Sequence, residues 1–398
     1  MSAAIRLALF ADSFHEVNGV ALTCRQFESH AARNGLPLLG VHSGPATRAW
    51  DEGSVTHCEL TTSKLFLPLD SGLRFDLAFW RHSRFVEDAL RAFRPDAIHI
   101  TGPSHIGILG LLLSRRLRLP LFASWHTNVH EYAGRRLPPF LRAPLGRAAE
   151  RASLALTARF YRFARALFAP NMDLVRLLEA RTGRECHLMT RGVDTQLFRP
   201  GQARSAGAPL SIGYVGRLSV EKNVRLLASV EKSLSKAGLD QFAIDIAGSG
   251  SERGWLRANV ARLRDHGTLH GEALARLYSQ FDIFVFPSET DTFGNVVQEA
   301  MASGVACVVM DKGGPASIVR HGETGLVASS PESFCRAAVE LASAPWLRRR
   351  LGRAARTAMH GRSWDSVFEE MYRVYGQDLL ASPPLPYASS LELENRAV

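Results

Sequence analysis

The chain has 398 residues, of which 46% are apolar and 22% are charged. This length exceeds the roughly 250–300 residues at which a single core stops growing, and the composition excludes a disordered chain, so we expect two folded domains. The formal net charge of +10 leaves nucleic acid, a membrane surface and acidic substrates open as partners.

Hydropathy and cysteine content argue against a membrane-spanning or disulfide-bonded protein. The best apolar run, residues 106–113, is shorter than the about 20 residues that a membrane span needs. The apolar run at residues 5–11 is too short for a signal peptide and predicts a first buried strand. The five cysteines are scattered without metal-ligand spacing, which suggests a reducing compartment. We therefore expect a soluble cytoplasmic protein without a bound metal.

Short apolar runs alternate with longer amphipathic stretches along the chain. In chain order, we predict strands at residues 6–10, 38–41, 97–100, 121–124, 166–169, 211–215, 242–246, 283–286 and 306–309. Predicted helices include residues 85–93, 144–166, 224–237, 252–263, 295–301 and 363–380. This alternation indicates parallel, doubly wound sheets, so we predict an α/β fold with two Rossmann-like domains.

A run rich in glycine, alanine and proline at residues 200–209 predicts the domain boundary. The first domain then spans residues 1–199 and the second spans residues 200–362. After the helix predicted at 363–380, residues 381–398 form a proline-containing tail for which we expect no fixed structure.

The positive charge is concentrated in the first half, where residues 1–200 carry 26 basic and 17 acidic residues. If residues 144–166 form one helix, five arginines fall within an arc of about 120°: Arg147, Arg151, Arg159, Arg162 and Arg165. Six apolar residues fall roughly opposite: Leu145, Ala149, Leu156, Phe160, Phe163 and Leu167. Either this is an ordinary amphipathic helix packed on its own sheet, or the arginines dock on anionic lipid. No nucleic-acid-binding module accompanies the charge, so nucleic acid is not an expected partner.

The most informative segment, residues 287–304, runs from a strand end through a polar turn into a helix. Ligands of open α/β sheets bind beyond the carboxyl ends of strands, and a helix N-terminus there presents N–H groups to a phosphate. Asp291 and Glu299 bracket this turn, and such carboxylates suit the hydroxyl groups that flank the phosphates of a nucleotide sugar. The alternative is a helix whose acidic residues only stabilise its dipole.

Four further residues have both a structural and a functional interpretation. Arg217 and Lys222 follow the first strand of the second half, where fixed cations could stabilise a leaving diphosphate without a metal ion, or could simply be solvated. His126 follows the strand at 121–124, although a lone histidine is more often structural. Gly19, after the first strand, is either a turn glycine or a point of close backbone approach.

These motifs together resemble a known family. The Asp291-x7-Glu299 pair around Phe293 and Gly294 is similar to the acidic-x7-Glu signature of retaining nucleotide-sugar glycosyltransferases with GT-B architecture, the glycosyl transferases group 1. Further matches occur in the right order at residues 18–20, 125–128, 191–195, 216–223, 313–315 and 322–326. The resemblance covers about residues 5–380.

The resemblance implies that the second domain binds the donor, that the first binds the acceptor in a cleft between them, and that the helix at 363–380 returns to the first domain. It places Arg217 and Lys222 on the diphosphate, Glu299 on the ribose and Asp291 on the donor sugar. The usual residue at position 291 is Glu, so Asp291 reaches one methylene less. The remaining donor contacts that it implies are Gly19, His126 and the backbone at Phe293, Gly294, Asn295 and Val296. It implies no cofactor and no metal.

The residues of these motifs are most similar to those of bacterial GDP-mannose-dependent glycolipid α-mannosyltransferases. We therefore expect retaining transfer of mannose to a hydroxyl of a glycolipid or other membrane-associated acceptor, at the cytoplasmic face of the inner membrane. The alternatives are a diacylglycerol glycosyltransferase that uses UDP-glucose or UDP-sulfoquinovose, a nucleotide-sugar 2-epimerase, and a non-catalytic nucleotide-sugar sensor.

Overall fold

The computed structural model describes residues 4–16, 18–70, 73–126, 139–201 and 207–381. The chain forms two compact units: unit 1 comprises Met1–Thr190 and Val367–Val398, and unit 2 comprises Arg191–Ser366. The first change of unit therefore precedes the linker at residues 200–209. Segment 191–199 belongs to unit 2 because its backbone is bonded there, for example from the Val193 N–H to the Arg362 carbonyl and from Arg356 to the Thr195 carbonyl.

Unit 1 is built on a sheet with the strand order β10-β9-β8-β7-β1-β2-β4-β3. Neighbouring strands are parallel except β3 and β4, which are antiparallel. The strands are β1 (Leu7–Ala11), β2 (Leu38–Gly44), β3 (Arg48–Glu52), β4 (Val55–Thr61), β7 (Ala97–Ile100), β8 (Leu121–Ser124), β9 (Ala166–Ala169) and β10 (Glu185–Leu188). A separate antiparallel pair is formed by β5 (Phe66–Asp70) and β6 (Leu73–Asp76).

The helices of unit 1 begin at short polar side chains that cap their first N–H groups. Asn18, Ser104 and Asn171 accept hydrogen bonds from the first turns of α1, α3 and α6. The helices are α1 (Gly19–Arg33), the 3₁₀ helix η1 (Phe79–His82), α2 (Ser83–Phe93), α3 (His105–Leu117), α5 (Pro139–Tyr161), α6 (Met172–Thr182) and α14 (Trp364–Ala381). Their apolar faces bury the central strands, which are inaccessible to solvent over most of their length.

Unit 2 contains an all-parallel sheet with the order β13-β12-β11-β14-β15-β16. The strands are β11 (Leu210–Val215), β12 (Phe242–Ala247), β13 (Leu263–Asp265), β14 (Ile283–Phe286), β15 (Ala306–Met310) and β16 (Gly325–Ala328). The helices are η2 (Val220–Lys222), α7 (Leu226–Lys236), α8 (Arg253–Asn259), α9 (Gly271–Tyr278), α10 (Asn295–Ala302), α11 (Pro315–Ile318), α12 (Pro331–Ser343) and α13 (Pro345–Met359). The strand order reverses between β11 and β14, so their carboxyl ends form the position at which such sheets bind ligands.

The predicted fold class is confirmed, and the differences concern individual elements. The strands missed from the sequence include β3, β10, β13 and β16, which lie at sheet edges where long apolar runs are not needed. The helix predicted at 252–263 ends at Asn259 because the edge strand β13 begins at Leu263. The helix predicted at 144–166 instead spans Pro139–Tyr161, because Ala166 already belongs to β9.

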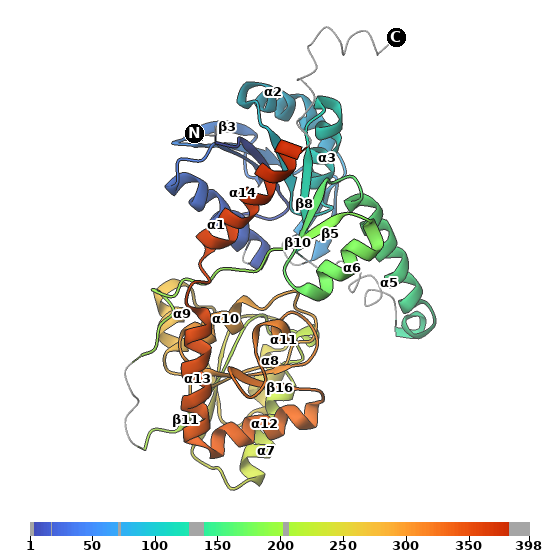
Figure 1. Ribbon diagram of the computed structural model, residues 1–398. Helices are drawn as coiled ribbons and strands as arrows, with labels where there is room; N and C mark the ends of the chain where they lie inside the picture. Colours follow the sequence, from blue (N-terminus) through green and yellow to red (C-terminus); the bar gives the residue numbers. More distant parts are fainter. Residues whose placement is uncertain (1–3, 17, 71–72, 127–138, 202–206, 382–398) are drawn as a thin grey trace, which may run out of the picture. The chain divides into compact units, whose positions relative to one another are not determined.

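Helix α14 starts in unit 2 and packs in unit 1. Ser363 accepts a hydrogen bond from the Ser366 N–H at 3.1 Å, as expected for a helix cap. Beyond it, Phe368, Met371 and Tyr375 are buried, and α14 lies beside α1, with the rings of Phe27 and Phe368 4.7 Å apart (Figure 1).

Two sequence expectations concern the membrane and the thiols. Within the described ranges, no helix is both long enough and apolar enough to cross a membrane. All five cysteines are described; they are buried free thiols. Residues 382–398 of the predicted tail lie outside the described residues.

Candidate active site

The polar turn after β14 leads into α10 through Gly294. Gly294 has a φ of +108°, in the region that favours glycine, and α10 starts at Asn295. The N–H groups of Asn295 and Val296 belong to the first turn, where no intrahelical acceptor exists. At Gly314 a Cβ would lie 2.2 Å from the Phe293 Cα, so this second turn fits against the first only as glycine. The sequence motif therefore forms a helix N-terminus beyond a strand end, as predicted.

Two of the predicted donor-binding residues contact each other directly. Lys222, at the end of η2, donates a hydrogen bond from Nζ to Asp291 Oδ1 at 2.7 Å. The lysine side chain is 13% exposed and the aspartate side chain is 22% exposed. Oδ2 of Asp291 is buried without a hydrogen-bond partner. One carboxylate oxygen is thus held by the lysine, and the other has no hydrogen-bond donor.

Arg217 is placed by the loop between β11 and η2. The Tyr214 hydroxyl donates to the Arg217 carbonyl at 2.9 Å, and the guanidinium lies 3.8 Å from Glu221. Burial raises the pKa of Tyr214 well above its ordinary value, and the charges of Asp291, Glu221 and Arg217 also act on it. The charged groups of this loop and of the turn after β14 are thus gathered around one buried phenol.

Glu299 lies one turn into α10 and has a partner that the sequence did not reveal. The Tyr278 hydroxyl, from α9, donates to Glu299 Oε2 at 2.9 Å. Burial raises the pKa of Glu299 to about 7, while the Tyr278 hydrogen bond lowers it. In its ionised form, Glu299 can accept hydrogen bonds from ligand hydroxyls through its other oxygen.

In unit 1, His126 ends a chain of buried side chains. Tyr375 OH lies 2.8 Å from His99 Nδ1, His99 Nε2 lies 2.9 Å from Ser124 Oγ, and Ser124 Oγ lies 2.6 Å from His126 Nε2. Burial lowers the pKa of His99 to about 3, so its ring is neutral and both donates and accepts. The chain therefore links α14 to His126 and constrains which ring nitrogen of His126 carries a proton.

A small hollow in unit 1 adjoins this chain. His126 lines it together with Ser124, His99, Thr101 from the end of β7 and Met371 from α14. Gly19 is the first residue of α1 and is exposed, so it is a helix N-terminal residue and not the plain turn glycine of one sequence interpretation.

Comparison with known proteins shows the family to which the chain belongs. The family described as Glycosyltransferase Family 4 matches residues 17–197, and Glycosyl transferases group 1 matches residues 209–344. The GDP-mannose-dependent alpha-mannosyltransferase of Mycolicibacterium smegmatis is 32% identical over 93% of this chain and 97% of its own length. The protein of the same name from Mycobacterium tuberculosis is 30% identical over 93% of this chain and 96% of its own length. The chain therefore belongs to the glycosyltransferases that these two family descriptions cover.

Structural likeness shows the same GT-B fold for this glycosyltransferase. Sucrose-phosphate synthase from Thermosynechococcus elongatus superposes with a TM-score of 0.76 at 19% identity, covering 95% of this chain and all of the other. Anabaena HepE, solved in complex with UDP, superposes with a TM-score of 0.69 at 14% identity, covering 94% of this chain and all of the other.

The basic segment of the glycosyltransferase differs from the predicted helix. Arg151 and Arg159 are exposed on α5, whereas the Arg147 side chain lies outside the described residues. Arg162 and Arg165 follow the end of the helix: Arg162 donates to the Arg181 carbonyl at 3.1 Å, and Arg165 forms an ion pair with Asp378 of α14 at 3.1 Å. Arg165 thus stabilises α14 and is not a free docking residue.

The predicted apolar face is also only partly buried. Leu156 is 71% exposed and Phe163 is 41% exposed, while Leu167 is fully buried in β9. The Arg115 guanidinium lies 3.9 Å from the centre of the Phe163 ring. Phe163 and Leu167 lie beyond α5, which ends at Tyr161, and Leu156 is exposed within it, so the helix does not bury all six apolar residues on its own sheet.

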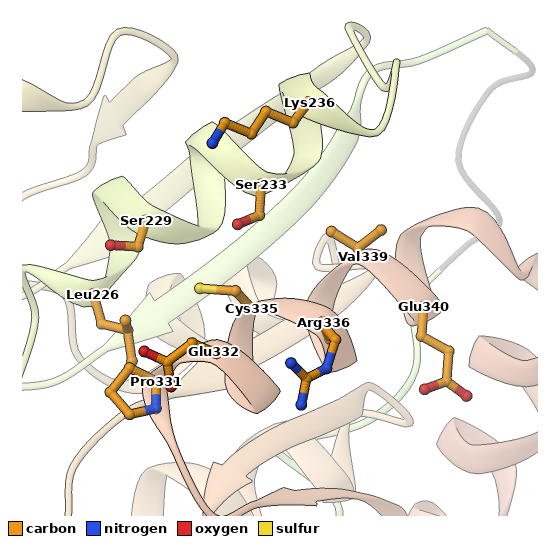
Figure 2. A pocket seen from close by; sticks show the side chains of 10 residues that line it. All are labelled: Leu226, Ser229, Ser233, Lys236, Pro331, Glu332, Cys335, Arg336, Val339 and Glu340. Carbon is orange, nitrogen blue, oxygen red and sulfur yellow. The ribbon is translucent and has the colours of Figure 1, made fainter.

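A larger hollow of the glycosyltransferase lies on the helical layer of unit 2 (Figure 2). Ser229, Ser233 and Lys236 line it from α7, and Cys335 and Arg336 line it from α12. It contains none of the predicted site residues, so we do not place the donor there.

Tyr278, Ser124, His99 and Tyr375 are the site residues that sequence reasoning missed. Tyr278, His99 and Tyr375 contact their partners through the tertiary fold. Ser124 contacts His126 only two positions farther along the chain, so the sequence held a local signal for it.

Proposed function

We propose that this glycosyltransferase transfers mannose from GDP-mannose, with retention at the anomeric carbon, to a hydroxyl of a membrane-associated glycolipid. The choice of GDP-mannose as the donor rests on the similarity to GDP-mannose-dependent mannosyltransferases over almost the whole of both chains. A third protein of that name, from Corynebacterium glutamicum, is 28% identical over 98% of this chain.

The proposed donor site consists of unit 2 residues around the start of α10. The diphosphate accepts hydrogen bonds from the backbone N–H groups at Gly294, Asn295 and Val296 and lies near Arg217 and Lys222. These cations oppose the negative charge that develops on the leaving nucleoside diphosphate, the task that a divalent metal performs elsewhere. Glu299 accepts from the ribose hydroxyls, and Asp291 accepts from the sugar through the oxygen that Lys222 leaves unbound.

His126 and Gly19 are the contributions of unit 1. His126 orients the donor sugar and stabilises the reacting centre, and it does not act as a base. The N–H groups at the start of α1 approach the diphosphate or the acceptor. No side chain is assigned as a nucleophile. We therefore propose that the acceptor hydroxyl attacks the sugar from the face that the diphosphate leaves, and that an oxygen of the leaving phosphate takes the proton of this hydroxyl.

Membrane association is proposed through the exposed arginines and apolar side chains of unit 1. Arg151, Arg159 and Leu156 are exposed on α5, and Phe163 is exposed in the segment after it. Arg115, near the end of α3, is also exposed and lies over the Phe163 ring, so cationic and apolar groups occur together here. Such a combination suits the headgroup region of an anionic membrane at its cytoplasmic face.

A second candidate is a glycosyltransferase that uses UDP-glucose or UDP-sulfoquinovose and a diacylglycerol acceptor. Its support is the Arabidopsis sulfoquinovosyl transferase SQD2, which is 30% identical over 61% of this chain and 48% of its own length. An epimerase or a nucleotide-sugar sensor would need neither acceptor nor transfer.

A thermal-shift panel with GDP, UDP, ADP and their hexose conjugates tests the donor. Ligands that bind only the folded state raise the melting temperature, so GDP and GDP-mannose should stabilise the protein more than the others. Preference for UDP would replace the proposal with the second candidate. Consumption of the donor without an acceptor would indicate an epimerase, and binding without transfer to any glycolipid would indicate a sensor.

A further inference from the structure

Unit 1 contains a cluster of histidine and glutamate side chains on the side of its sheet where β2 and β4 pair. His42 lies on β2, Glu59 lies on β4, and His15 lies in the segment between β1 and α1. One ligand atom from each of these three residues lies within 4.8 Å of the other two. None of the three belongs to the proposed donor site.

We propose that His15, His42 and Glu59 bind a zinc-type divalent transition-metal ion. Two imidazoles and one carboxylate are a common protein ligand set for such ions, and they leave a position for water. His15 Nε2 and Glu59 Oε1 are 3.2 Å apart. Ligand atoms bound at about 2.0–2.1 Å to a tetrahedral ion are roughly 3.3 Å apart, so this pair already has nearly the spacing required.

One ring nitrogen of His42 is hydrogen-bonded, and the other has no hydrogen-bond partner. Its side chain is 1% exposed, and Nε2 is buried without a hydrogen-bond partner. Its Nδ1 lies 3.3 Å from the Ser43 carbonyl, so Nδ1–H donates there and Nε2 keeps its lone pair. The Phe14 ring stacks on the imidazole with centres 4.1 Å apart, which holds its plane. A buried lone pair without a donor costs stability, and a bound cation would satisfy it.

Glu59 divides its two oxygens between different partners. Arg48 Nε lies 2.9 Å from Oε2, while Oε1 is directed to His15. Metal-bound carboxylates are commonly held by a hydrogen bond to the second oxygen, so Arg48 fits that role. At Gly44 a Cβ would lie 2.1 Å from Glu59 Oε1, so the absence of a side chain there makes room for the carboxylate.

Glu28 lies next to the cluster, and its Oε1 is buried without a hydrogen-bond partner. A nearby cation would also satisfy this oxygen.

A second set, Glu28, His42 and His57, shares His42 with the first. We favour the first set because the His15 side chain is 53% exposed, which provides an entry path for the ion. In the second set His57 already lies 3.5 Å from Glu52 and 3.6 Å from Glu28. An ion bound by His15, His42 and Glu59 would link the segment before α1 to β2 and β4.

The test uses the full chain, stripped with a chelator and titrated with Zn²⁺ by calorimetry and with Co²⁺ by visible absorption. We expect one ion per chain and Co²⁺ bands typical of low coordination number. H15Q and E59Q should each weaken Zn²⁺ affinity at least about tenfold. H15Q alters an exposed side chain, so its fold should persist, and circular dichroism checks this.

H187Q is the matched control, because His187 lies on β10 at the opposite edge of the same sheet. It should bind Zn²⁺ as the parent chain does. Absence of stoichiometric Zn²⁺ binding, or equal affinity of H15Q and the parent, would overturn the proposal. Loss of binding in H57Q with retention in H15Q would also overturn it, since the ion would then occupy the second set.

Discussion

Lys222 Nζ donates to Asp291 Oδ1 at 2.7 Å, so a lysine of the loop after β11 and a carboxylate of the turn after β14 form one ion pair. Each was expected to touch a different part of the donor. Because they are paired, the position of each depends on the other, and a donor that draws Lys222 toward its diphosphate also changes what Asp291 can accept.

Lys222→Ala should lower turnover on the order of 100-fold or more, because a cation beside the leaving diphosphate acts mainly in the transition state. Steady-state rates and circular dichroism of the same sample measure this. Lys312→Ala is the control, since Lys312 lies near Glu289 at 3.7 Å with a 67% exposed side chain. Turnover of Lys222→Ala close to that of the parent would show that the diphosphate lies elsewhere.

Donor binding should strengthen as the pH rises through about 7, because ionised Glu299 accepts hydrogen bonds from ribose hydroxyls and the protonated carboxyl accepts fewer. Titration calorimetry with GDP between pH 6 and 8.5 measures it. Glu299→Gln should bind more weakly and lose this pH dependence. Tyr278→Phe removes the hydrogen bond that lowers the pKa, so its midpoint should move to higher pH.

The stability of the free protein should change with pH in the opposite direction. The pKa of Glu299 is raised from 4.5 to about 7 in the folded state, so its contribution is full below about pH 4.5 and is lost as the pH rises to about 7. Denaturant unfolding of Glu299→Gln should show a smaller loss of stability over this interval than the parent. Identical curves would contradict the raised pKa.

Ser124→Ala should lower kcat at least about tenfold while leaving donor affinity nearly unchanged, because Ser124 positions His126 without touching the donor. Tyr375→Phe breaks the same chain two residues farther away and should act in the same direction. Tyr372→Phe is the control on the same helix, since the Tyr372 hydroxyl is buried without a hydrogen-bond partner. Equal effects of the two tyrosine changes would indicate a packing role only.

His126→Ala should reduce kcat more than it weakens donor binding, because its proposed role is in the reacting complex. Comparing kcat with the dissociation constant of GDP-mannose distinguishes the two effects. Equal losses in both would show that His126 only binds substrate.

Arg151→Glu combined with Arg159→Glu should weaken binding to anionic liposomes roughly tenfold or more, since each basic residue near such a surface contributes about 1 kcal/mol. Co-sedimentation at low and high salt measures this. The charge-matched control is Arg349→Glu with Arg353→Glu, which reverses two exposed arginines of α13 in unit 2. Liposome binding that does not depend on lipid charge or on salt concentration would contradict the docking proposal.

The sequence by itself determined the two α/β units and the turn before α10. Central parallel strands are buried on both faces, so apolar runs such as Ile283–Phe286 are visible without any partner. Gly294, the carboxylates at 291 and 299, and the cations at 217 and 222 lie in short local motifs, and their spacing survives folding because one turn or one helix holds each motif.

Only the tertiary structure decided which side chains meet. Tyr278 reaches Glu299, and Tyr375 reaches His99 across 276 positions of the chain. His15, His42 and Glu59 likewise come together from a loop and two strands. The end of α5 at Tyr161 also separates Arg165 from the predicted arginine face and pairs it with Asp378. Such contacts depend on the order and register of strands, which residue periodicity alone does not specify.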